Sequence, residues 1–410
     1  MRQQMNQMEK FKSKVRKPNF FVYFFLMIVL RIYIYLKCNV KVYKKNIRNM
    51  RKKKPFVLVF NHGSKLDFCF SYLPLTTRIN TMVAYYYFCN YKVGKLLRTL
   101  GGYPKYLFAP DISAIKNTMK VIKNNGAVGI SPEGRLSPHG AIESVNPATS
   151  KLLKKLKVDV YCCTIRGAYF TFPKWSNEIR RGRVDIRYDL LFSKDDMMNL
   201  SEEVIQNKLE DALYYDEFEW QEENKVYFKG KNMAKGLDHI LYICPVCHHM
   251  YTISSNGNYL ECSHCHMNVK LNNYYEFETT YTIPKNIKEW YNWQKQYERD
   301  NLVPNFELVS KVKLKLPDPK GKGFSFVGNG KITFNKDVLI YDGLINNELK
   351  KIEYRIENIQ AIVFGVNEDF EIYQDDNLYY FIPDNIKECT RYSILAEIFY
   401  NDYLKKNELA

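Results

Sequence analysis

The stretch that decides the fold is residues 55–67, which read PFVLVFNHGSKLD. Its apolar part, Phe56–Phe60, is short and continuous, as expected of a strand buried on both faces of a parallel sheet. A Gly-Ser pair then favours a turn, and Asp67 suits the start of a following helix. On one regular helix, side chains five residues apart point about 140° apart, so His62 and Asp67 could not meet there. A strand–turn–helix path would bring them together.

This pair of side chains predicts proton-transfer chemistry. A carboxylate on one imidazole nitrogen fixes the tautomer and raises the basicity of the other nitrogen. His62 would then act as a general base that removes the proton of an alcohol, with Asp67 holding the ring. Taken alone, the same residues also fit a strand-to-helix turn with a capping Asp and a surface His.

A second apolar run has the same form. Residues 127–130 (AVGI) lead into residues 131–137 (SPEGRLS). Loops at the carboxyl ends of strands are where α/β sheets place ligand sites. Arg135 could grip a phosphate with two hydrogen bonds, while Glu133 accepts from a hydroxyl or orients the guanidinium. A surface Glu–Arg pair is the alternative.

Together, His-x-x-x-x-Asp and the later Pro-Glu-Gly-Arg resemble the glycerolipid acyltransferase family, whose best-known members are lysophosphatidate (1-acyl-sn-glycerol-3-phosphate) acyltransferases. The first family block is similar to Asn61–Asp67, the second to Gly101–Lys105, the third to Glu133–Ser137 and the fourth to Val158–Gly167. The resemblance covers roughly residues 20 to 230.

The resemblance implies an enzyme that moves an acyl group from acyl-CoA or acyl carrier protein to the hydroxyl of a lysophospholipid. Backbone N–H groups near the first turn would stabilise the oxyanion, and neither a covalent acyl-enzyme nor a catalytic metal is needed. The resemblance implies that His62 and Asp67 are catalytic, and that the substrate is held by Ser64, Lys105, Glu133, Gly134 and Arg135.

The chain departs from the family pattern in three places. The third block lacks its Thr, so Arg135 directly follows Gly134. Lys105 stands where Arg is common, and Cys162 and Cys163 lie where the fourth block usually has Pro. These departures leave the acceptor headgroup more open than the reaction type.

The N-terminal region predicts a membrane-associated helix. Phe20–Leu36 is apolar except for Arg31, and its 17 residues would span about 25 Å as a helix, short of the roughly 30 Å hydrocarbon core. Lysines and arginines crowd both flanks, at residues 10–17 and 37–54. Since positive flanks resist translocation, we expect a monotopic helix on the cytoplasmic face, in one leaflet or at the interface, rather than a span. A buried core helix is the alternative.

Four of the ten cysteines form two C-x-x-C pairs, Cys244/Cys247 and Cys262/Cys265, with 14 residues between the pairs. This spacing predicts a zinc ribbon with one structural Zn²⁺. His248, His264 and His266 are interpreted as bystanders, and a nucleic-acid-binding ribbon is the functional alternative. No small-residue cleavage site follows the apolar stretch, so a reducing, cytosolic setting fits best.

The last third of the chain predicts strands and a closing helix. Turn signals at Pro317-Asp318-Pro319, Gly328-Asn329-Gly330 and Asp342-Gly343 separate them. Several strands with a terminal helix are similar to a pleckstrin-homology (PH) or GRAM-like barrel. The expected strands are Val309–Leu316, Gly330–Phe334, Val338–Tyr341, Ile359–Phe364, Phe370–Tyr373 and Leu378–Ile382.

The predicted fold class is an α/β acyltransferase domain, a mixed sheet flanked by helices, followed by a small four-cysteine zinc ribbon and a β-rich PH/GRAM-like domain. The net charge of +17 implies an anionic partner, for which a membrane surface is favoured over nucleic acid. A lipid-sensing or nucleic-acid- or protein-binding module on a non-catalytic fold remains the competing hypothesis. The expected segments are 1–54 (membrane anchor), 55–235 (acyltransferase), 236–275 (ribbon), 276–300 (connector) and 301–410 (β-rich domain).

Overall fold

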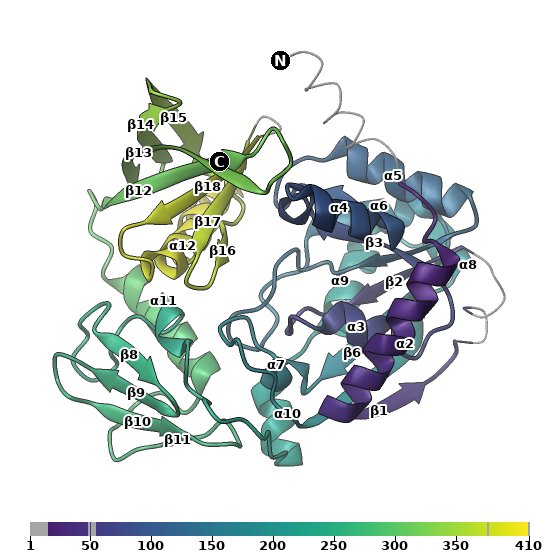
Figure 1. Cartoon of the computed structure of the whole chain (residues 1–410), viewed down its shortest axis with the longest axis horizontal. Helices are drawn as coiled ribbons and strands as arrows, with labels where there is room; N and C mark the ends of the chain where they lie inside the picture. The colour runs from purple at the N-terminus through teal and green to yellow at the C-terminus, as the bar shows by residue number, and fades with distance from the viewer. Residues whose placement is uncertain (1–14, 48–49, 51–54, 375–376, 409–410) are drawn as a thin grey trace. The chain divides into compact units, whose positions relative to one another are not determined.

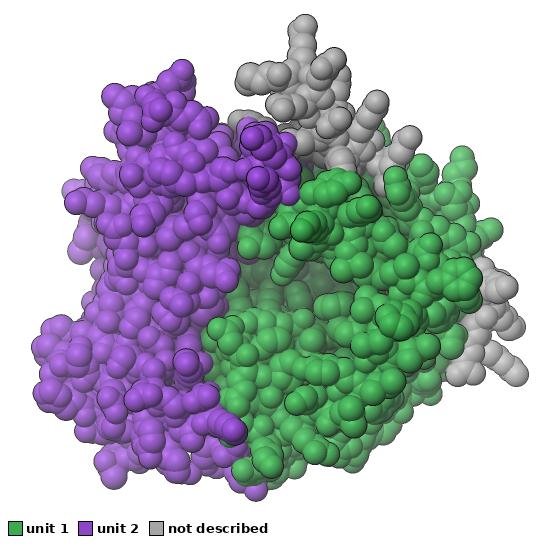
Figure 2. All heavy atoms as spheres, viewed as in Figure 1, with its two compact units in different colours: residues 1–105, 111–230 green, residues 106–110, 231–410 purple. Residues whose placement is uncertain are grey.

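The computed structural model describes residues 15–47, 50, 55–374 and 377–408. The chain forms two compact units (Figure 2). Unit 1 comprises residues 1–105 and 111–230, and unit 2 comprises residues 106–110 and 231–410. Each unit has its own sheets and core, so each is described by itself.

Unit 1 is built on a seven-stranded mixed sheet (Figure 1). β7 pairs antiparallel with β6, and every other neighbouring pair is parallel. In spatial order the strands are β1 (Asn39–Lys44), β7 (Arg183–Phe192), β6 (Asp159–Arg166), β2 (Phe56–Phe60), β5 (Ala127–Ile130), β3 (Ile79–Ala84) and β4 (Gly102–Lys105). The mixed sheet and the strands expected at 56–60, 127–130 and 158–167 are thereby confirmed.

The central strand β2 is buried on both faces, as its uniformly apolar sequence predicts. Phe56, Leu58 and Phe60 belong to one core cluster, and Val57 and Val59 to a second. The alternation follows from the two-residue period of a strand, which points successive side chains to opposite faces.

Helices cover both faces of this sheet. α2 (Phe20–Lys37) and α3 (Asp67–Tyr72) contribute to the first cluster. The second cluster receives side chains from α5 (Ile112–Lys123), α6 (Pro147–Leu156) and α9 (Glu202–Leu213). The remaining helices of unit 1 are α4 (Tyr91–Thr99), α7 (Ala168–Thr171), α8 (Lys194–Asn199) and α10 (Glu217–Asn224), with the 3₁₀ helix η2 (Tyr85–Phe88).

The expected N-terminal helix is present as α2, which Asn19 caps by accepting from the Val22 N–H. It is long and apolar enough to cross a membrane, and only 17% of it is buried inside the protein. Tyr23, Met27 and Ile34 form its buried stripe. The expected basic flanks fall partly outside the described residues, at positions 10, 12, 14, 48 and 51–54.

Unit 2 begins with a small antiparallel sheet in the order β11-β10-β9-β8. Its strands are β8 (Ile253–Asn256), β9 (Tyr259–Cys262), β10 (Asn268–Leu271) and β11 (Phe277–Glu278), and the 3₁₀ helix η3 (Leu237–His239) precedes them. The expected connector contains α11 (Ile287–Asp300), which packs on this module because Trp290 is buried and its Nε1 donates to the Ile243 carbonyl at 3.0 Å.

The rest of unit 2 is a second seven-stranded sheet, in which all neighbouring strands are antiparallel. The long helix α12 (Glu388–Glu408) closes it, and the Tyr392 ring stacks on Phe370 with 4.3 Å between centroids. In spatial order the strands are β15 (Glu348–Arg355), β14 (Val338–Ile345), β13 (Phe324–Phe334), β12 (Leu308–Pro317), β18 (Asn377–Pro383), β17 (Asp369–Gln374) and β16 (Val363–Gly365).

Two of the turns that the sequence predicted at glycines lie inside strands, so these predictions are wrong. Residues 328–330 lie inside β13, and Asp342-Gly343 lies inside β14. The glycines instead permit close packing: a Cβ on Gly330 would lie 2.5 Å from the Tyr341 ring, and one on Gly343 would lie 2.3 Å from the Gly330 Cα. The chain turns at Asn346 and Asn347, both with positive φ.

Two strand predictions also need correction. The expected strand at 359–364 begins only at Val363, because the 3₁₀ helix η4 (Ile356–Asn358) precedes it and Ile359 and Ile362 are buried from a loop. The strand β15 was not predicted. It lies at the edge of the sheet and is mostly exposed, so its sequence is charged rather than alternately apolar.

Candidate active site and metal centre

The strand–turn–helix path predicted for the first block is present in the structure. β2 ends at Phe60, residues 61–66 form the turn, and Asp67 opens α3. His62 Nδ1 lies 3.0 Å from Asp67 Oδ2, which also accepts from the Ser64 N–H at 2.7 Å. Asp67 is fully buried, whereas the His62 side chain is 32% exposed. The predicted contact is therefore confirmed, and no described residue hydrogen-bonds His62 Nε2, which can accept a proton from a ligand.

Four backbone N–H groups of this turn already have acceptors within the protein. The His62, Ser64 and Lys65 N–H groups donate to Glu133 Oε1, Asp67 Oδ2 and the Phe172 carbonyl, at 2.6, 2.7 and 3.1 Å. The next N–H, of Leu66, donates to Ser64 Oγ at 3.3 Å. These N–H groups are satisfied within the protein because they hold the tight turn in shape.

The third block clamps His62 by its backbone. Glu133 Oε1 accepts from the His62 N–H at 2.6 Å, and the His62 carbonyl accepts from the Ser137 N–H at 2.9 Å. The hydroxyl of Tyr215 donates to Glu133 Oε2 at 3.2 Å. The imidazole is thus positioned by residues more than 70 positions away in the sequence.

These contacts differ from the substrate-binding roles expected for three residues. Glu133 is buried, and both of its oxygens have protein partners. Ser64 is buried too, and its hydroxyl donates to the Phe172 carbonyl at 3.2 Å. Gly134 adopts φ of 73°, a left-handed conformation that favours glycine, so it shapes the loop. Glu133 and Ser64 organise the turn that carries the histidine, and Gly134 shapes the neighbouring loop.

The two predicted phosphate-gripping cations lie apart. Arg135 Nε donates to Glu143 Oε2 in a largely buried ion pair. Lys105 ends β4, and the strand order β2-β5-β3-β4 places it three strand spacings from β2, about 14 Å at about 4.8 Å per strand. Burial lowers the pKa of Lys105. Lys105 ends β4 and Arg135 follows β5, and both strands end at the same edge of the sheet as the strand that precedes His62.

Sequence reasoning missed two supports of the site. The side chain of Asn61 spans β2 and β6: its Nδ2 donates to the Ile165 carbonyl at 3.0 Å and its Oδ1 accepts from the Ile165 N–H at 2.7 Å. Tyr215 is fully buried beside Glu133. Asn directly after an apolar strand was a usable signal for the first support, whereas Tyr215 belongs to no motif and follows α9 by two residues.

Burial raises the pKa of three carboxyl groups of unit 1. Burial raises the pKa of Asp67, and hydrogen bonding to His62 opposes this shift. Burial also raises the pKa of Glu133 to about 8, although the His62 N–H lowers it. Burial likewise raises the pKa of Glu217 to about 8 in the same unit, where this carboxyl accepts from the Gly167 N–H at 2.5 Å.

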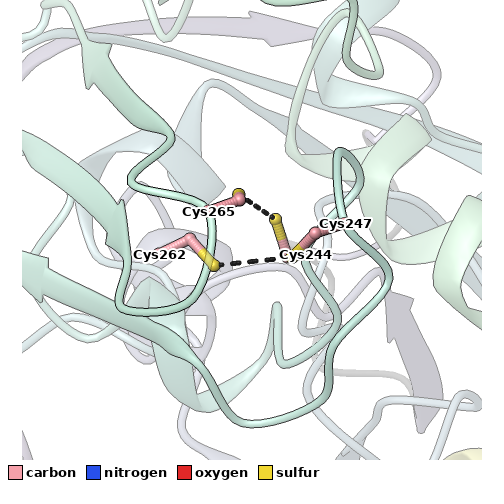
Figure 3. Close-up of side chains that lie close together, drawn as sticks. All are labelled: Cys244, Cys247, Cys262 and Cys265. Carbon is pink, nitrogen blue, oxygen red and sulfur yellow. Dashed lines mark hydrogen bonds between the residues drawn. The ribbon is translucent and has the colours of Figure 1, made fainter.

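The four cysteines of the two C-x-x-C pairs come together in unit 2, as Figure 3 shows. The Cys244–Cys265 and Cys247–Cys262 sulfur distances are both 3.7 Å, and all four sulfurs lie within 4.8 Å of one another. Four thiolates about 2.3 Å from one Zn²⁺ would place neighbouring sulfurs about 3.8 Å apart. The arrangement therefore fits a tetrahedral metal ion.

Each pair sits in a knuckle with the same backbone bonds. The N–H of the residue after the second cysteine donates to the carbonyl of the first cysteine, His248 to Cys244 at 2.9 Å and His266 to Cys262 at 3.0 Å. Both histidines have positive φ. The His264 ring stacks on His249 at 3.4 Å between centroids, and Cys247, His249 and His264 form a second group of close ligand atoms.

Part of this chain is similar to known proteins. A search of curated proteins gave no match. A crystal structure of the 1-acyl-sn-glycerophosphate (LPA) acyltransferase PlsC from Thermotoga maritima is similar at a TM-score of 0.37 and 20% identity, over 45% of this chain and 76% of that chain. The family model described as Acyltransferase matches residues 40–166. This segment holds His62, Asp67 and Glu133, and it is similar to the acyltransferase family over those residues.

Proposed function

We propose that this protein transfers an acyl group from an acyl thioester, on coenzyme A or acyl carrier protein, to the free hydroxyl of a lysophospholipid. The leading acceptor is 1-acyl-sn-glycerol-3-phosphate, which would give phosphatidic acid. The observation that carries the proposal is the His62–Asp67 contact, with a buried carboxylate on Nδ1 and a solvent-accessible imidazole, inside the segment that matches the acyltransferase model.

In this mechanism, Nε2 of His62 removes the proton of the acceptor hydroxyl as its oxygen attacks the thioester carbonyl. Asp67 holds the imidazole in the tautomer with the proton on Nδ1 and stabilises the imidazolium that forms. The proton then passes from His62 to the departing thiolate as the tetrahedral intermediate collapses. Glu133, through the His62 N–H, keeps the ring in place. Arg135 and Lys105 lie at the same sheet edge, and either would have to leave its present partners to bind the acceptor phosphate.

We further propose that Cys244, Cys247, Cys262 and Cys265 hold one structural Zn²⁺. Four cysteines complete a tetrahedral site, so the ion would cross-link the two knuckles and leave no position for substrate. The sulfur distances support this assignment.

Two further parts of the proposal concern the membrane association of α2 and the fold type of residues 301–410. The exposed apolar side chains of α2, including Phe21 (79%), Phe25 (71%) and Leu36 (69%), support monotopic association with a membrane. The basic flanks of the helix favour its cytoplasmic face. Arg31 holds the helix on unit 1 through the Leu73 and Leu75 carbonyls, both at 2.6 Å, as an interfacial helix requires. The antiparallel sheet with its terminal helix α12 supports a PH/GRAM-like assignment for residues 301–410.

The test is acyl transfer by the purified full chain in detergent micelles, with lysophosphatidate and acyl-CoA, then with acyl carrier protein and other lyso-acceptors. Wild-type protein should form product, and His62→Ala should lose about 10²–10⁴-fold in rate. The matched control is His239→Ala, which changes a histidine of unit 2 outside both sites. Equal rates for wild type and His62→Ala would contradict the mechanism, and silence from wild type with every donor and acceptor would favour a binding module.

A further inference from the structure

Helix α4 and the preceding turn η2 present apolar side chains to solvent. Tyr87, Tyr91, Val93 and Leu96 are 51%, 50%, 41% and 52% exposed. Gly94 is the one buried residue of α4, all of whose residues are described. A surface helix of a globular protein normally turns its apolar side chains toward the core. α6 does so with its three leucines at 152, 153 and 156.

The charges on this segment have one sign. Residues 85–99 contain Lys92, Lys95 and Arg98 and no Asp or Glu. Arg98 lies over the Phe88 ring at 5.0 Å, and Lys92 and Lys95 are exposed. An exposed apolar face bordered by cations, without carboxylates to repel phosphate, is complementary to an anionic lipid surface.

The segment also belongs to the same layer as α2. The Asn19 N–H, at the start of α2, donates to the Thr99 carbonyl at the end of α4 at 2.9 Å. Leu100, directly after α4, packs against the core cluster that contains the buried stripe of α2. Figure 1 shows both helices in front of the sheet of unit 1. α5 and α6 contribute to the cluster on the opposite face.

We propose that η2 and α4 form a second membrane-contact surface that rests on anionic lipid headgroups while α2 enters the leaflet. The proposal rests on the membrane placement of α2 given above. Because Asn19 joins the two helices, insertion of the exposed α2 residues carries the end of α4 to the interface. Tyr87 and Tyr91 are of the residue type that is enriched at headgroup depth. An acidic protein is the competing occupant, but it would not account for the backbone bond that joins α4 to the apolar helix α2.

The experiment measures binding of the full chain to phosphatidylglycerol/phosphatidylcholine vesicles and to pure phosphatidylcholine vesicles. Lys92→Glu/Lys95→Glu should weaken binding to the anionic vesicles at least about tenfold, with a much smaller effect on neutral vesicles. Val93→Ser/Leu96→Ser should weaken binding to both. The matched controls lie on the opposite face of the sheet, namely Lys151→Glu/Lys155→Glu in α6 and Ile112→Ser/Ile115→Ser in α5, and they should stay within about threefold of wild type.

Hydrogen exchange of wild-type protein with and without anionic vesicles gives a readout that needs no variant. Protection of residues 85–99 without equal protection of α5 supports the proposal. The proposal is overturned if both α4 variants bind vesicles as wild type does, or if the control variants lose as much binding. It is also overturned if an acidic carrier protein, and not the vesicles, protects α4. A wild-type protein that fails to bind vesicles overturns it as well. Acyl transfer in detergent micelles, which the α4 variants should retain, tests the enzymatic proposal separately.

Discussion

The histidine turn of unit 1 and the cysteine cluster of unit 2 are held in different ways. His62 and Asp67 are five residues apart, yet their turn is fixed by Glu133, Ile165 and Phe172, which lie 71, 104 and 108 positions from their partners. Each cysteine knuckle instead closes its own backbone ring within about five residues, at Cys244–His248 and Cys262–His266. One site depends on the packed sheet around it, and the other depends on local turns and on the ion proposed to join them.

The contrast predicts which properties of the protein a substitution at each site should change. A change in the histidine turn should alter the rate of acyl transfer and leave unit 2 folded. Loss of a cysteine should remove the proposed metal cross-link between the two knuckles, whose other contacts include the His249–His264 ring stack and the Ser263-to-Thr252 backbone bond. It should leave the histidine turn intact. The predictions below set these two outcomes against each other.

The largest effect is expected from Cys262→Ser. Structural zinc contributes about 10–16 kcal/mol of apparent binding free energy in small zinc modules, so the variant should lose its metal and the folded state of residues 240–271. Zinc-to-protein ratio and hydrogen exchange of this segment are the measurements. Cys389→Ser, a buried cysteine of unit 2 outside the cluster, should keep one metal per chain. A metal-loaded, protected Cys262→Ser protein would exclude the four-cysteine site.

The next effect is expected from Asp67→Asn. Asn cannot stabilise an imidazolium and favours the wrong tautomer, so kcat should fall about 10²–10⁴-fold. Zinc content should not change. The matched control is Asp111→Asn, which preserves the N-cap of α5 and leaves His62 untouched. A rate for Asp67→Asn within about threefold of wild type would mean that the carboxylate does not orient the base.

A smaller effect is expected when the clamp on His62 is removed. Glu133→Ala leaves the His62 N–H without its acceptor, which should move the imidazole and lower kcat about 10–100-fold. Glu217→Ala is the control, because Glu217 is equally buried but bonds Gly167 instead. Both variants should unfold at lower temperature, but only Glu133→Ala should lose activity per folded molecule. Equal losses of activity would make Glu133 a general support of unit 1.

The smallest effect concerns pH. Burial raises the pKa of Glu133 to about 8, above the value of about 4.5 in an unfolded chain. Its contribution to stability is therefore full below about pH 4.5 and is lost as pH rises through about 8, because the folded state binds the proton more tightly. Glu133→Gln should flatten the fall of the unfolding temperature between about pH 5 and 8 relative to wild type. An unchanged slope would show that Glu133 titrates normally.

The sequence predicted the elements that rest on local patterns. The all-apolar run at 56–60 became the central strand, and His62 and Asp67 met as the turn residues between them required. The cysteine spacing led to a compact sulfur cluster. The strand β15 was missed because an exposed edge strand has no apolar alternation, and Gly330 and Gly343 were misread because only strand packing reveals the close approach that they allow.

The sequence by itself determined a buried parallel strand followed by a histidine–aspartate turn, a cysteine spacing suited to one metal ion, and an apolar N-terminal helix. Only the tertiary structure decided what Glu133 and Ser64 contact, since whether a polar side chain faces a ligand or a backbone depends on residues far along the chain. It also supplied Tyr215 and Asn61 as supports of the site. The tertiary structure also revealed the exposed face of α4. A helical pattern shows that apolar residues share a side of a helix, but not whether anything covers that side.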